Sequence, residues 1–393
     1  MSSFDPERLV RQDLSDFPPY SMGHVPLADL DHLVKLDLNE NPFGPSPKAI
    51  AALSQMKHYN RYIGQDELRA AIAQYVGVDM AHIVVSNGAD EMIDWVQRVF
   101  LNRGDAIVDC PPSFEMYAFF ARVNGARILA VPRREDFSLD VDAIESVIVN
   151  SVKQSPPADS ETLAGANVAS WQRVLTEVQS QRIMEAQAPK LIFLANPSNP
   201  DGGVASRADV ERLLALPVIV VLDEAYAEFA GESYAARVPS QPNLIVLRTF
   251  SKWAGLASLR VGYCVAPKPI AAKILQIKSP ENVNAAGIVA ALASLEDREY
   301  LLANVRRINE EKGRLTSALA QLGFIQPLPS RANFILCRVA GRDGRQVRDA
   351  LAKRNILIRA LSSPRLKEYI RIAVGTPDEN LLLIQALKEI KNG

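Results

Sequence analysis

A lysine and an arginine stand eight residues apart in the segment TFSKWAGLASLRVGY (249–263), between two apolar runs. Lys252 follows Ser251 directly, and Arg260 precedes the apolar run VGYCVA. A lysine amine can condense with an aldehyde to form a Schiff base, and an arginine fork together with a hydroxyl can bind a phosphate. The segment therefore indicates a covalent cofactor site with Lys252 as the attachment point; a solvated loop with two surface cations is the simpler alternative.

Three polar residues and one aromatic residue follow other apolar runs. Asp223 ends the run PVIVVLD, where a carboxylate taken out of water needs a partner group. Tyr226 follows three residues later, and Asn199 lies between two prolines after KLIFLAN. Phe114 follows DAIVDC, where a lone aromatic residue is more often part of the core than a platform for a cofactor. Because a carboxylate can keep a pyridine nitrogen protonated, Asp223 and Lys252 together fit a pyridine ring that carries an aldehyde.

The residues after HIVVS complete a predicted phosphate site. Gly88 stands there, and Ala89 and Asp90 begin a helical pattern. The N-terminus of a helix presents free backbone N–H groups and the positive end of the helix dipole, which suits a phosphate. Most strand–glycine–helix turns bind no ligand. This turn therefore indicates a phosphate site only in combination with Ser251 and Arg260.

Short apolar runs alternate with helical patterns from about residue 48 to residue 270. Helical patterns such as 89–102 and 207–216 lie between runs that are rich in β-branched residues and continuously apolar, as strands buried on both faces of a parallel sheet are. This alternation predicts an α/β architecture, whose sites lie at the carboxyl ends of the strands. The candidate strands are 82–86, 105–110, 126–132, 190–196, 217–223, 243–249 and 261–266.

The pattern changes after about residue 280, where strands at 332–339 and 369–374 follow helices at 300–321 and 344–354 and indicate a smaller α+β domain. We expect three parts: an N-terminal arm (1–45) that joins the small domain, a large cofactor-binding domain (46–280) and a small C-terminal domain (281–393).

The large domain contains an expected insertion at 150–188. Its first part, 150–170, is polar and contains prolines, and a helical pattern follows at 171–187. Nothing in its residues suggests a function.

Composition disfavours several classes of partner. The 393 residues are 48% hydrophobic and 23% charged with a net charge of −1, which gives no electrostatic reason to bind nucleic acid or a membrane surface. No apolar run approaches the roughly 18 residues of a membrane helix, and the first residues do not form a signal peptide. Three cysteines far apart fit a reducing cytoplasm, and the four histidines lack metal-binding spacing, so we expect no metal site.

Seven segments carry a resemblance to a known family: LDLNENPFGPSP, SNGADE, CPPSFEMY, NPSNPDGG, LDEAYAEF, TFSKWAGLASLRVGY and YIRIAVGTPDEN. They are similar to the successive motifs of the fold-type I, pyridoxal 5'-phosphate (PLP)-dependent class I/II aminotransferases, and most of all to the histidinol-phosphate aminotransferases. The resemblance runs from about Phe17 to the C-terminus, and its motifs are highly specific as a set. It implies a mainly parallel seven-stranded sheet between helices, PLP as cofactor, an amino donor and a 2-oxo acid as substrates, and a cytoplasmic homodimer with shared active sites.

The resemblance also implies roles for the cofactor-site residues. Lys252 would form the Schiff base and move the proton between the substrate's Cα and the cofactor's C4′, and Asp223 would pair with the pyridine nitrogen. The other implied contacts are Asn199 and Tyr226 at the 3-hydroxyl, Phe114 stacked on the ring, the backbone of Ala89 and Asp90 with Ser251 and Arg260 at the phosphate, and Tyr62 at the phosphate of the neighbouring subunit.

Two arginines and a tyrosine are implied for substrate binding. Arg371, in YIRIAVG, matches the arginine that grips the substrate carboxylate in aminotransferases. L-Histidinol phosphate carries a phosphate ester in place of that carboxylate, and Arg359, in NILIRAL, fits as a second cation. Tyr20, in FPPY, matches a lid over the same phosphate. The simpler alternatives are a solvated edge-strand charge for Arg359 and a packing aromatic for Tyr20.

The sequence departs from the family pattern in a few places. Ile63 stands where relatives usually have proline, Asp201 where threonine is common, and Phe114 where many relatives have tyrosine. The insertion at 150–188 has no counterpart in compact bacterial relatives.

The expected reaction converts L-histidinol phosphate and 2-oxoglutarate to imidazole-acetol phosphate and L-glutamate, in histidine biosynthesis. An aromatic or other amino-acid aminotransferase and a decarboxylase of a phosphorylated amino acid, such as threonine phosphate, are alternatives that the arginines do not separate, because each substrate presents an anion there. A catalytically silent binding protein is disfavoured by the intact Lys252. A nicotinamide dehydrogenase is disfavoured because no G-x-G-x-x-G follows the first strand.

Overall fold

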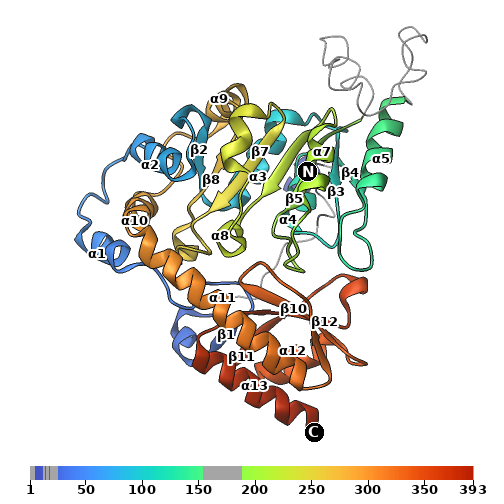
Figure 1. Cartoon of the computed structure of the whole chain (residues 1–393). Coiled ribbons are helices and arrows are strands. Elements are labelled where there is room, and N and C mark those ends of the chain that lie inside the picture. Colours follow the sequence, from blue (N-terminus) through green and yellow to red (C-terminus); the bar gives the residue numbers. More distant parts are fainter. Residues whose placement is uncertain (1–4, 12–13, 15–16, 18–24, 154–187, 393) are drawn as a thin grey trace.

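The structure, a computed structural model, describes residues 5–11, 14, 17, 25–153 and 188–392 and contains two β-sheets (Figure 1). The larger sheet has seven strands, in the order β2-β8-β7-β6-β5-β3-β4. All neighbouring strands are parallel except β8, which is antiparallel to both β2 and β7. The predicted α/β class with a mainly parallel seven-stranded sheet is confirmed. The strands are β2 (Ile83–Ser86), β3 (Ala106–Asp109), β4 (Arg127–Ala130), β5 (Pro189–Ala195), β6 (Ile219–Asp223), β7 (Leu244–Thr249) and β8 (Gly262–Val265).

Burial explains why most of these strands are continuously apolar. Every residue of β2, β3, β7 and β8 is buried, so neither face of these strands needs polar side chains. The edge strand β4 differs, because both of its end residues are exposed. The prediction of burial on both faces is therefore wrong for β4, although β2, the strand at the other edge of the sheet, is fully buried.

Helices cover both faces of the large sheet and create two separate cores. Helices α3, α4 and α9 pack on one face around Tyr117 and Phe193. Helices α2, α5, α7 and α10 pack on the other face, around Trp253 and Tyr263. The helices of this part are α1 (Pro47–Gln55), α2 (Asp66–Val76), α3 (Gly88–Phe100), α4 (Met116–Val123), α5 (Val141–Lys153), α7 (Arg207–Leu214), α8 (Ala227–Ala230), α9 (Lys268–Ile277) and α10 (Ala285–Glu296).

The smaller sheet has five strands, in the order β1-β11-β12-β10-β9. Its strands are β1 (Val34–Leu36), β9 (Ile325–Pro327), β10 (Phe334–Val339), β11 (Ile356–Ala360) and β12 (Tyr369–Ala373), and its helices are α11 (Arg298–Gln321), α12 (Gly344–Ala352) and α13 (Pro377–Asn392). A third core lies between this sheet and the helices. The first strand, β1, comes from the N-terminal region and pairs in parallel with β11.

Short 3-10 helices complete the described chain: η1 (Pro6–Leu9), η3 (Leu27–His32), η4 (Met80–His82), η6 (Ala235–Ser240), η7 (Ala257–Leu259) and η8 (Pro364–Leu366). Residues 150–153 of the expected insertion belong to α5. The remainder, 154–187, including the helix predicted at 171–187, lies outside the described residues.

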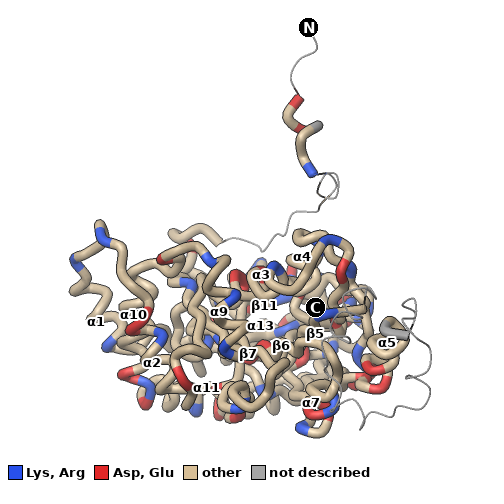
Figure 2. Tube along the Cα trace, turned by 90° about the horizontal axis from the view of Figure 1, so that it is seen from above, with Lys and Arg blue, Asp and Glu red and all other residues tan. Residues whose placement is uncertain are grey.

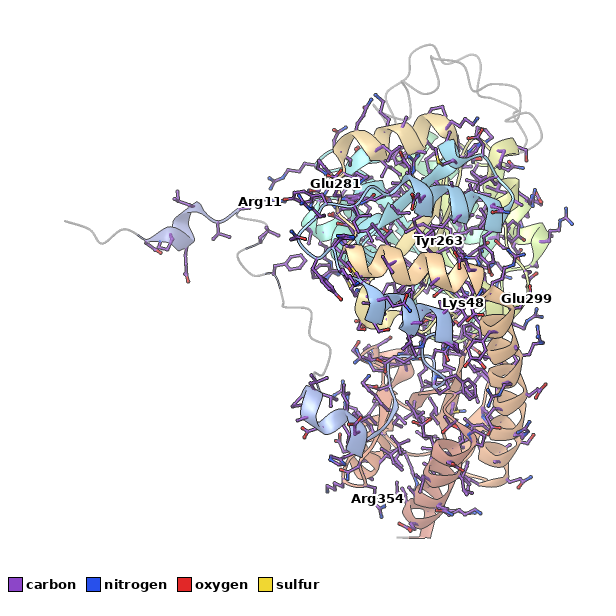
Figure 3. The ribbon with its side chains drawn as sticks, turned by 90° about the vertical axis from the view of Figure 1, so that its left-hand side faces the viewer. Arg11, Lys48, Tyr263, Glu281, Glu299 and Arg354 are labelled. Carbon is purple, nitrogen blue, oxygen red and sulfur yellow. The ribbon has the colours of Figure 1, made fainter. Side chains whose placement is uncertain are left out.

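The surface carries both signs of charge. Lys and Arg residues alternate with Asp and Glu over the view in Figure 2, as the net charge of −1 leads one to expect. Helix η1 projects away from the two sheets (Figure 2 and Figure 3). Within the described ranges, no helix has the length and hydropathy needed to cross a membrane.

A buried ion network supports the carboxyl ends of β6 and β7. Arg248, on β7, lies with its Nη1 3.3 Å from Glu224 Oε2, and its Nη2 pairs with Glu228 Oε1. All three side chains are at most 6% exposed. Tyr75 donates a further hydrogen bond to Glu228 at 3.3 Å. Because Glu224 follows the last residue of β6 directly, this network fixes the backbone that carries Asp223.

Replacing Arg248 with alanine would leave two buried carboxylates without their cation. We expect Arg248→Ala to lower the free energy of unfolding by about 3–5 kcal/mol, measured by urea unfolding followed by circular dichroism. The control is Arg338→Ala, because Arg338 forms a 2.9 Å ion pair with Glu368 in which both side chains are more than 40% exposed. That variant should lose less than about 1 kcal/mol. Equal losses in the two variants would contradict a structural role for the network.

Candidate active site

The predicted cofactor-site residues lie at the carboxyl ends of neighbouring strands of the large sheet. Asp223 ends β6, and Ser251 and Lys252 follow β7. Asn199 follows β5, and Phe114 follows β3. These strands are parallel, so their carboxyl ends share an edge, which is where α/β sheets place their ligands.

Lys252 lies close enough to Asp223 to influence the pKa of its carboxyl. Burial raises the pKa of the Asp223 carboxyl to about 6, and the nearby Lys252 amine acts against that rise. Burial, followed by the charges of Arg371 and Arg260, lowers the pKa of Lys252 to about 8. The site therefore brings together a carboxylate and an amine that is partly unprotonated near neutral pH.

The start of α3 and Arg260 form a cradle that fits a phosphate. The first N–H groups of α3, which include those of Ala89 and Asp90, have no acceptor within the helix. Arg260 Nη2 lies 2.9 Å from Asp90 Oδ2. A Cβ atom added to Gly88 would stand 2.3 Å from Arg260 Nη2, and one added to Gly262 would stand 2.5 Å from the carbonyl carbon of Gly88. The two glycines therefore permit the close approach of backbone and guanidinium.

Ser251 lies beside this cradle. Its side chain is buried, and its Oγ accepts a hydrogen bond from Thr249 Oγ1 at 3.0 Å. Thr249 also accepts the backbone N–H of Ser251 at 3.1 Å, so it orients the serine hydroxyl. Sequence reasoning missed Thr249, although it stands in the segment that contains Lys252.

Asn199, Tyr226 and Arg371 form a second group in the site. Arg371 Nη1 donates to Asn199 Oδ1 at 2.6 Å, which ties the small sheet to the loop after β5. Asp201 stabilises that loop by accepting hydrogen bonds from Ser198 Oγ and the Gly203 N–H, so the unusual aspartate holds the turn that presents Asn199. Burial raises the pKa of Tyr226, and the charge of Arg371 opposes this effect.

A short stretch between β1 and α1, residues 37–41, touches many of these side chains. Lys252 Nζ donates to the carbonyl of Leu38 at 2.8 Å, and Arg371 Nη2 donates to the carbonyl of Asp37 at 2.9 Å. Asn39 Nδ2 donates to the Tyr226 hydroxyl at 3.0 Å. Asn39 is buried with a φ of 55°, and sequence reasoning missed its contact although it quoted the motif LDLNENP.

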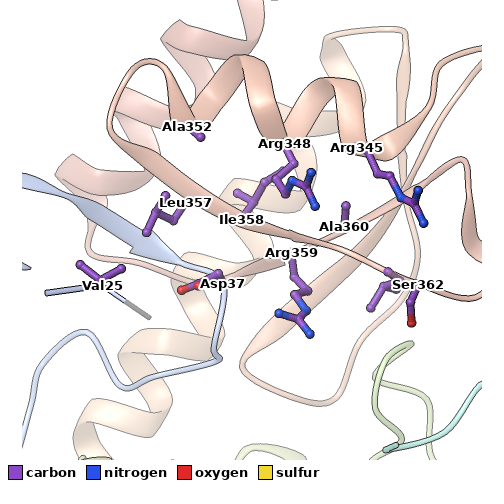
Figure 4. A pocket seen from close by; sticks show the side chains of 11 residues that line it. Val25, Asp37, Arg345, Arg348, Ala352, Leu357, Ile358, Arg359, Ala360 and Ser362 are labelled. Atoms are coloured by element: carbon purple, nitrogen blue, oxygen red, sulfur yellow. The ribbon is translucent and has the colours of Figure 1, made fainter. Parts of the chain in front are cut away.

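The two predicted substrate arginines are direct neighbours. Arg359 on β11 stands opposite Arg371 on β12 in antiparallel register, so both side chains lie on one face of the small sheet. Arg359 also lines a pocket of about 650 Å³ together with Asp37 and Arg345 (Figure 4). Like charges directly across an antiparallel pair destabilise a sheet, so this arrangement favours an anionic ligand.

The remaining predicted residues lie as follows. Phe114 is partly buried and meets Tyr117 edge-on, with ring centroids 5.6 Å apart. Tyr62 is 94% exposed and does not join the cluster within its own chain. Tyr20 lies outside the described residues.

Tyr117 is a further site residue that sequence reasoning missed. Its hydroxyl donates to Asp223 Oδ2 at 2.7 Å. The signal was its position three residues after Phe114 in CPPSFEMY, which a helix places on the same side.

Together, these groups fit PLP. They provide an amine for the aldehyde, a buried carboxylate for the ring nitrogen, and a helix N-terminus with an arginine and a serine for the phosphate. Among the described side chains, no group of three or more His, Cys, Asp and Glu residues could hold a metal ion.

Comparisons with known proteins agree with this geometry. The sequence model of the family "Aminotransferase class I and II" matches residues 31–387. The chain is 43% identical to a histidinol-phosphate aminotransferase of Roseiflexus castenholzii, over 97% of this chain and 98% of the relative. It is 42% identical to the chloroplastic histidinol-phosphate aminotransferase 1 of Arabidopsis thaliana, over 91% of this chain and 78% of that protein.

A solved structure also resembles this chain. The histidinol-phosphate aminotransferase of Sinorhizobium meliloti in complex with pyridoxal-5'-phosphate superposes with a TM-score of 0.79 at 26% identity, covering 100% of this chain and 98% of that one. The fold, the site chemistry and the match over residues 31–387 lead to one assignment: the chain belongs to the class I and II aminotransferases, which use PLP as their cofactor.

Proposed function

We propose that this aminotransferase converts L-histidinol phosphate and 2-oxoglutarate to imidazole-acetol phosphate and L-glutamate. The observation that favours a phosphorylated donor over one with only a carboxylate is the cross-strand pair of Arg359 and Arg371, of which Arg371 contacts Asn199. Two guanidinium groups on one face suit a phosphate dianion better than a single carboxylate. The names of the relatives that share 42–43% identity support the same substrate.

We propose that PLP is held by Asp223, Asn199 and Tyr226 at the ring, by the stacked Phe114, and by the α3 N-terminus with Ser251 and Arg260 at the phosphate. When bound, PLP supplies an aldehyde that links to amines and a ring that withdraws electrons from the substrate's α-carbon. Within the protein, Asp223 provides the negative charge beside the ring nitrogen.

Lys252 then has two tasks at one atom. Its Nζ attaches the cofactor, and after release it accepts the proton that leaves the substrate's α-carbon. A pKa of about 8 leaves roughly a tenth of the free amine unprotonated at neutral pH, which suits a general base. Arg371 and Arg359 orient the substrate by its anionic end, and Arg371 also suits the carboxylates of 2-oxoglutarate and glutamate.

We further propose a homodimer in which Tyr62 reaches the phosphate site of the partner subunit. The 94% exposure of Tyr62 supports this role, because a large aromatic side chain left in water indicates a contact surface. We also propose the arm, the large domain and the small domain as structural units. We propose a cytoplasmic location, because the free, buried Cys110, Cys264 and Cys337 fit a reducing compartment.

A donor panel tests the substrate against the two alternatives. We expect histidinol phosphate to be turned over at least about tenfold more efficiently than phenylalanine, a factor of ten corresponding to about 1.4 kcal/mol. With threonine phosphate, we expect no release of carbon dioxide. A preference for phenylalanine would favour an aromatic aminotransferase, and carbon dioxide release would favour the decarboxylase.

Lys252→Ala should lower kcat by about 10³-fold or more, because it removes both the attachment point and the base. Borohydride reduction of the loaded enzyme followed by peptide mass spectrometry should find covalent PLP at Lys252 in the wild type and none in the variant. The matched control is Lys312→Met, since Lys312 is another partly buried lysine whose pKa burial lowers to about 8, but its Nζ hydrogen-bonds Asn309 and the Ala332 carbonyl, neither of which is a predicted site residue. Full activity in Lys252→Ala would refute the assignment.

Arg359→Ala should raise KM for histidinol phosphate by about 10- to 100-fold, the value of one charge-assisted contact. For a donor with only a carboxylate, such as phenylalanine, the rise should stay below about threefold, because Arg371 remains. Arg345→Ala serves as the control, since Arg345 lines the same pocket but lies exposed on α12. Equal losses for both donors would remove the proposed phosphate role.

Subunit mixing tests the shared site. Lys252→Ala and Tyr62→Ala homodimers should each be impaired, but a heterodimer would contain one intact site and one doubly altered site. Random re-pairing of equal amounts should therefore restore about a quarter of the wild-type activity. If Tyr62 acts within its own chain, no heterodimer has an intact site and mixing restores nothing. Tyr59→Ala, a neighbouring exposed tyrosine, should keep full activity without mixing.

A further inference from the structure

We propose that Tyr117 is a positioning residue that fixes the Asp223 carboxylate and keeps it ionised for the cofactor's ring nitrogen. This inference rests on the cofactor-binding role proposed above for Asp223.

The hydroxyl of Tyr117 and one backbone group hold the two oxygens of the carboxylate. Tyr117 donates to Asp223 Oδ2 at 2.7 Å, and the N–H of Ala225 donates to Oδ1 at 3.1 Å. Each carboxylate oxygen can accept two hydrogen bonds. The two contacts therefore fix the plane of the carboxylate and still leave capacity for a third donor.

The ring of Tyr117 is itself held by three elements. It stacks on Phe193 of β5 with centroids 5.1 Å apart, and Phe114 meets it edge-on at 5.6 Å. Gln97 of α3 donates to the backbone carbonyl of Tyr117 at 3.0 Å. The side chain of Tyr117 is fully buried. The hydroxyl therefore cannot leave Asp223 without disturbing a packed core, and its position is set before any ligand binds.

The charged groups around Asp223 show why a donor is needed. Burial raises the pKa of Asp223, and the negative charge of Asp90 acts in the same direction, so that the pKa stands at about 6 with all of its neighbours present. The hydrogen bond from Tyr117 lowers this pKa, as do the Ala225 N–H and the charge of Lys252. Tyr117 and Ala225 are neutral donors, so their effect on Asp223 does not depend on the charge of Lys252.

Tyr117 remains a donor throughout the working pH range. Burial, together with the negative charge of Asp223, raises its pKa well above the usual value, and Asp109 and Tyr226 act in the same direction. A phenol that stays protonated stabilises the ionised carboxylate more than the neutral acid, because the hydrogen bond to the charged form is stronger. Its removal should therefore raise the pKa of Asp223 towards neutrality.

Tyr117→Phe tests this step, because it removes the hydroxyl and keeps the ring that packs on Phe193. The measurement is the dissociation constant of PLP from the apoenzyme between pH 5.5 and 8.5, followed by tryptophan fluorescence. Losing one hydrogen bond to a charged carboxylate should raise the pKa of that carboxyl by about one unit. The variant should bind PLP about fivefold more weakly than the wild type at pH 6, and within about 1.5-fold of it at pH 8.5, where the carboxyl is ionised in both proteins.

The matched control is Tyr263→Phe. Tyr263 is equally buried, and its hydroxyl has no hydrogen-bond partner among the described residues. This variant should keep the wild-type pH profile. Melting temperatures of the three apoproteins report on packing independently of the cofactor. A weaker affinity by the same factor at every pH, or an equal shift in Tyr263→Phe, would overturn the proposal.

Asp223→Asn separates this inference from the role of Asp223 itself. If Asp223 supplies the required charge, Asp223→Asn binds PLP weakly at all pH values, and adding Tyr117→Phe to it produces no further pH dependence. If Asp223→Asn keeps the affinity and profile of the wild type, the proposed role of Asp223 fails. If Asp223→Asn is impaired while Tyr117→Phe matches the wild type at pH 6, the role of Asp223 stands and the role of Tyr117 fails.

Discussion

The structure depends on keeping one negative charge buried. Asp223 is 5% exposed at the end of a strand whose three preceding residues are buried and apolar, where an unpartnered carboxylate would take up a proton. The hydroxyl of Tyr117, the N–H of Ala225 and the amine of Lys252 counter that tendency from three directions. Next to it, Arg248 pairs with Glu224 and Glu228, so that one buried cation offsets part of the cost of two further buried carboxylates.

The electrostatics of the site come from both sheets. The large sheet supplies the carboxylate and the amine, and the small sheet supplies a pair of guanidinium groups across β11 and β12. The positive charge of Arg371 lowers the pKa of Lys252, so an anion bound to Arg371 would reduce that effect. Substrate binding on one sheet is therefore coupled to the basicity of the amine on the other.

Most of the large sheet could be predicted because its strands are buried on both faces and read as continuous apolar runs. The exposure of the edge strand β4 and the antiparallel direction of β8 could not, since neither the position of a strand in the sheet nor its direction is encoded in a run of apolar residues. The strands β1 and β9 have three residues each, too few for a pattern.

The site was predictable in its residue types and less so in its contacts. The positions of Lys252, Asp223 and Asn199 followed from strand ends, and the resemblance supplied their roles. The register that sets Arg359 against Arg371 and the distance of 2.7 Å from Tyr117 to Asp223 depend on the three-dimensional arrangement of segments far apart in sequence. Tyr117 resembles an ordinary core tyrosine until folding brings it against Asp223, which lies 106 positions later in the sequence.

The stretch at residues 37–41 both contacts Lys252 and follows a strand of the small sheet. It connects β1, which pairs in the small sheet, to α1, and its Leu38 carbonyl accepts a hydrogen bond from Lys252 Nζ, the atom proposed to attach the cofactor. Any covalent use of that nitrogen withdraws a donor from this connector, while Arg371 and Asn39 still hold the residues on either side. The connector between the two sheets therefore lacks one hydrogen bond when Lys252 is covalently engaged, and it regains that bond when the amine is free.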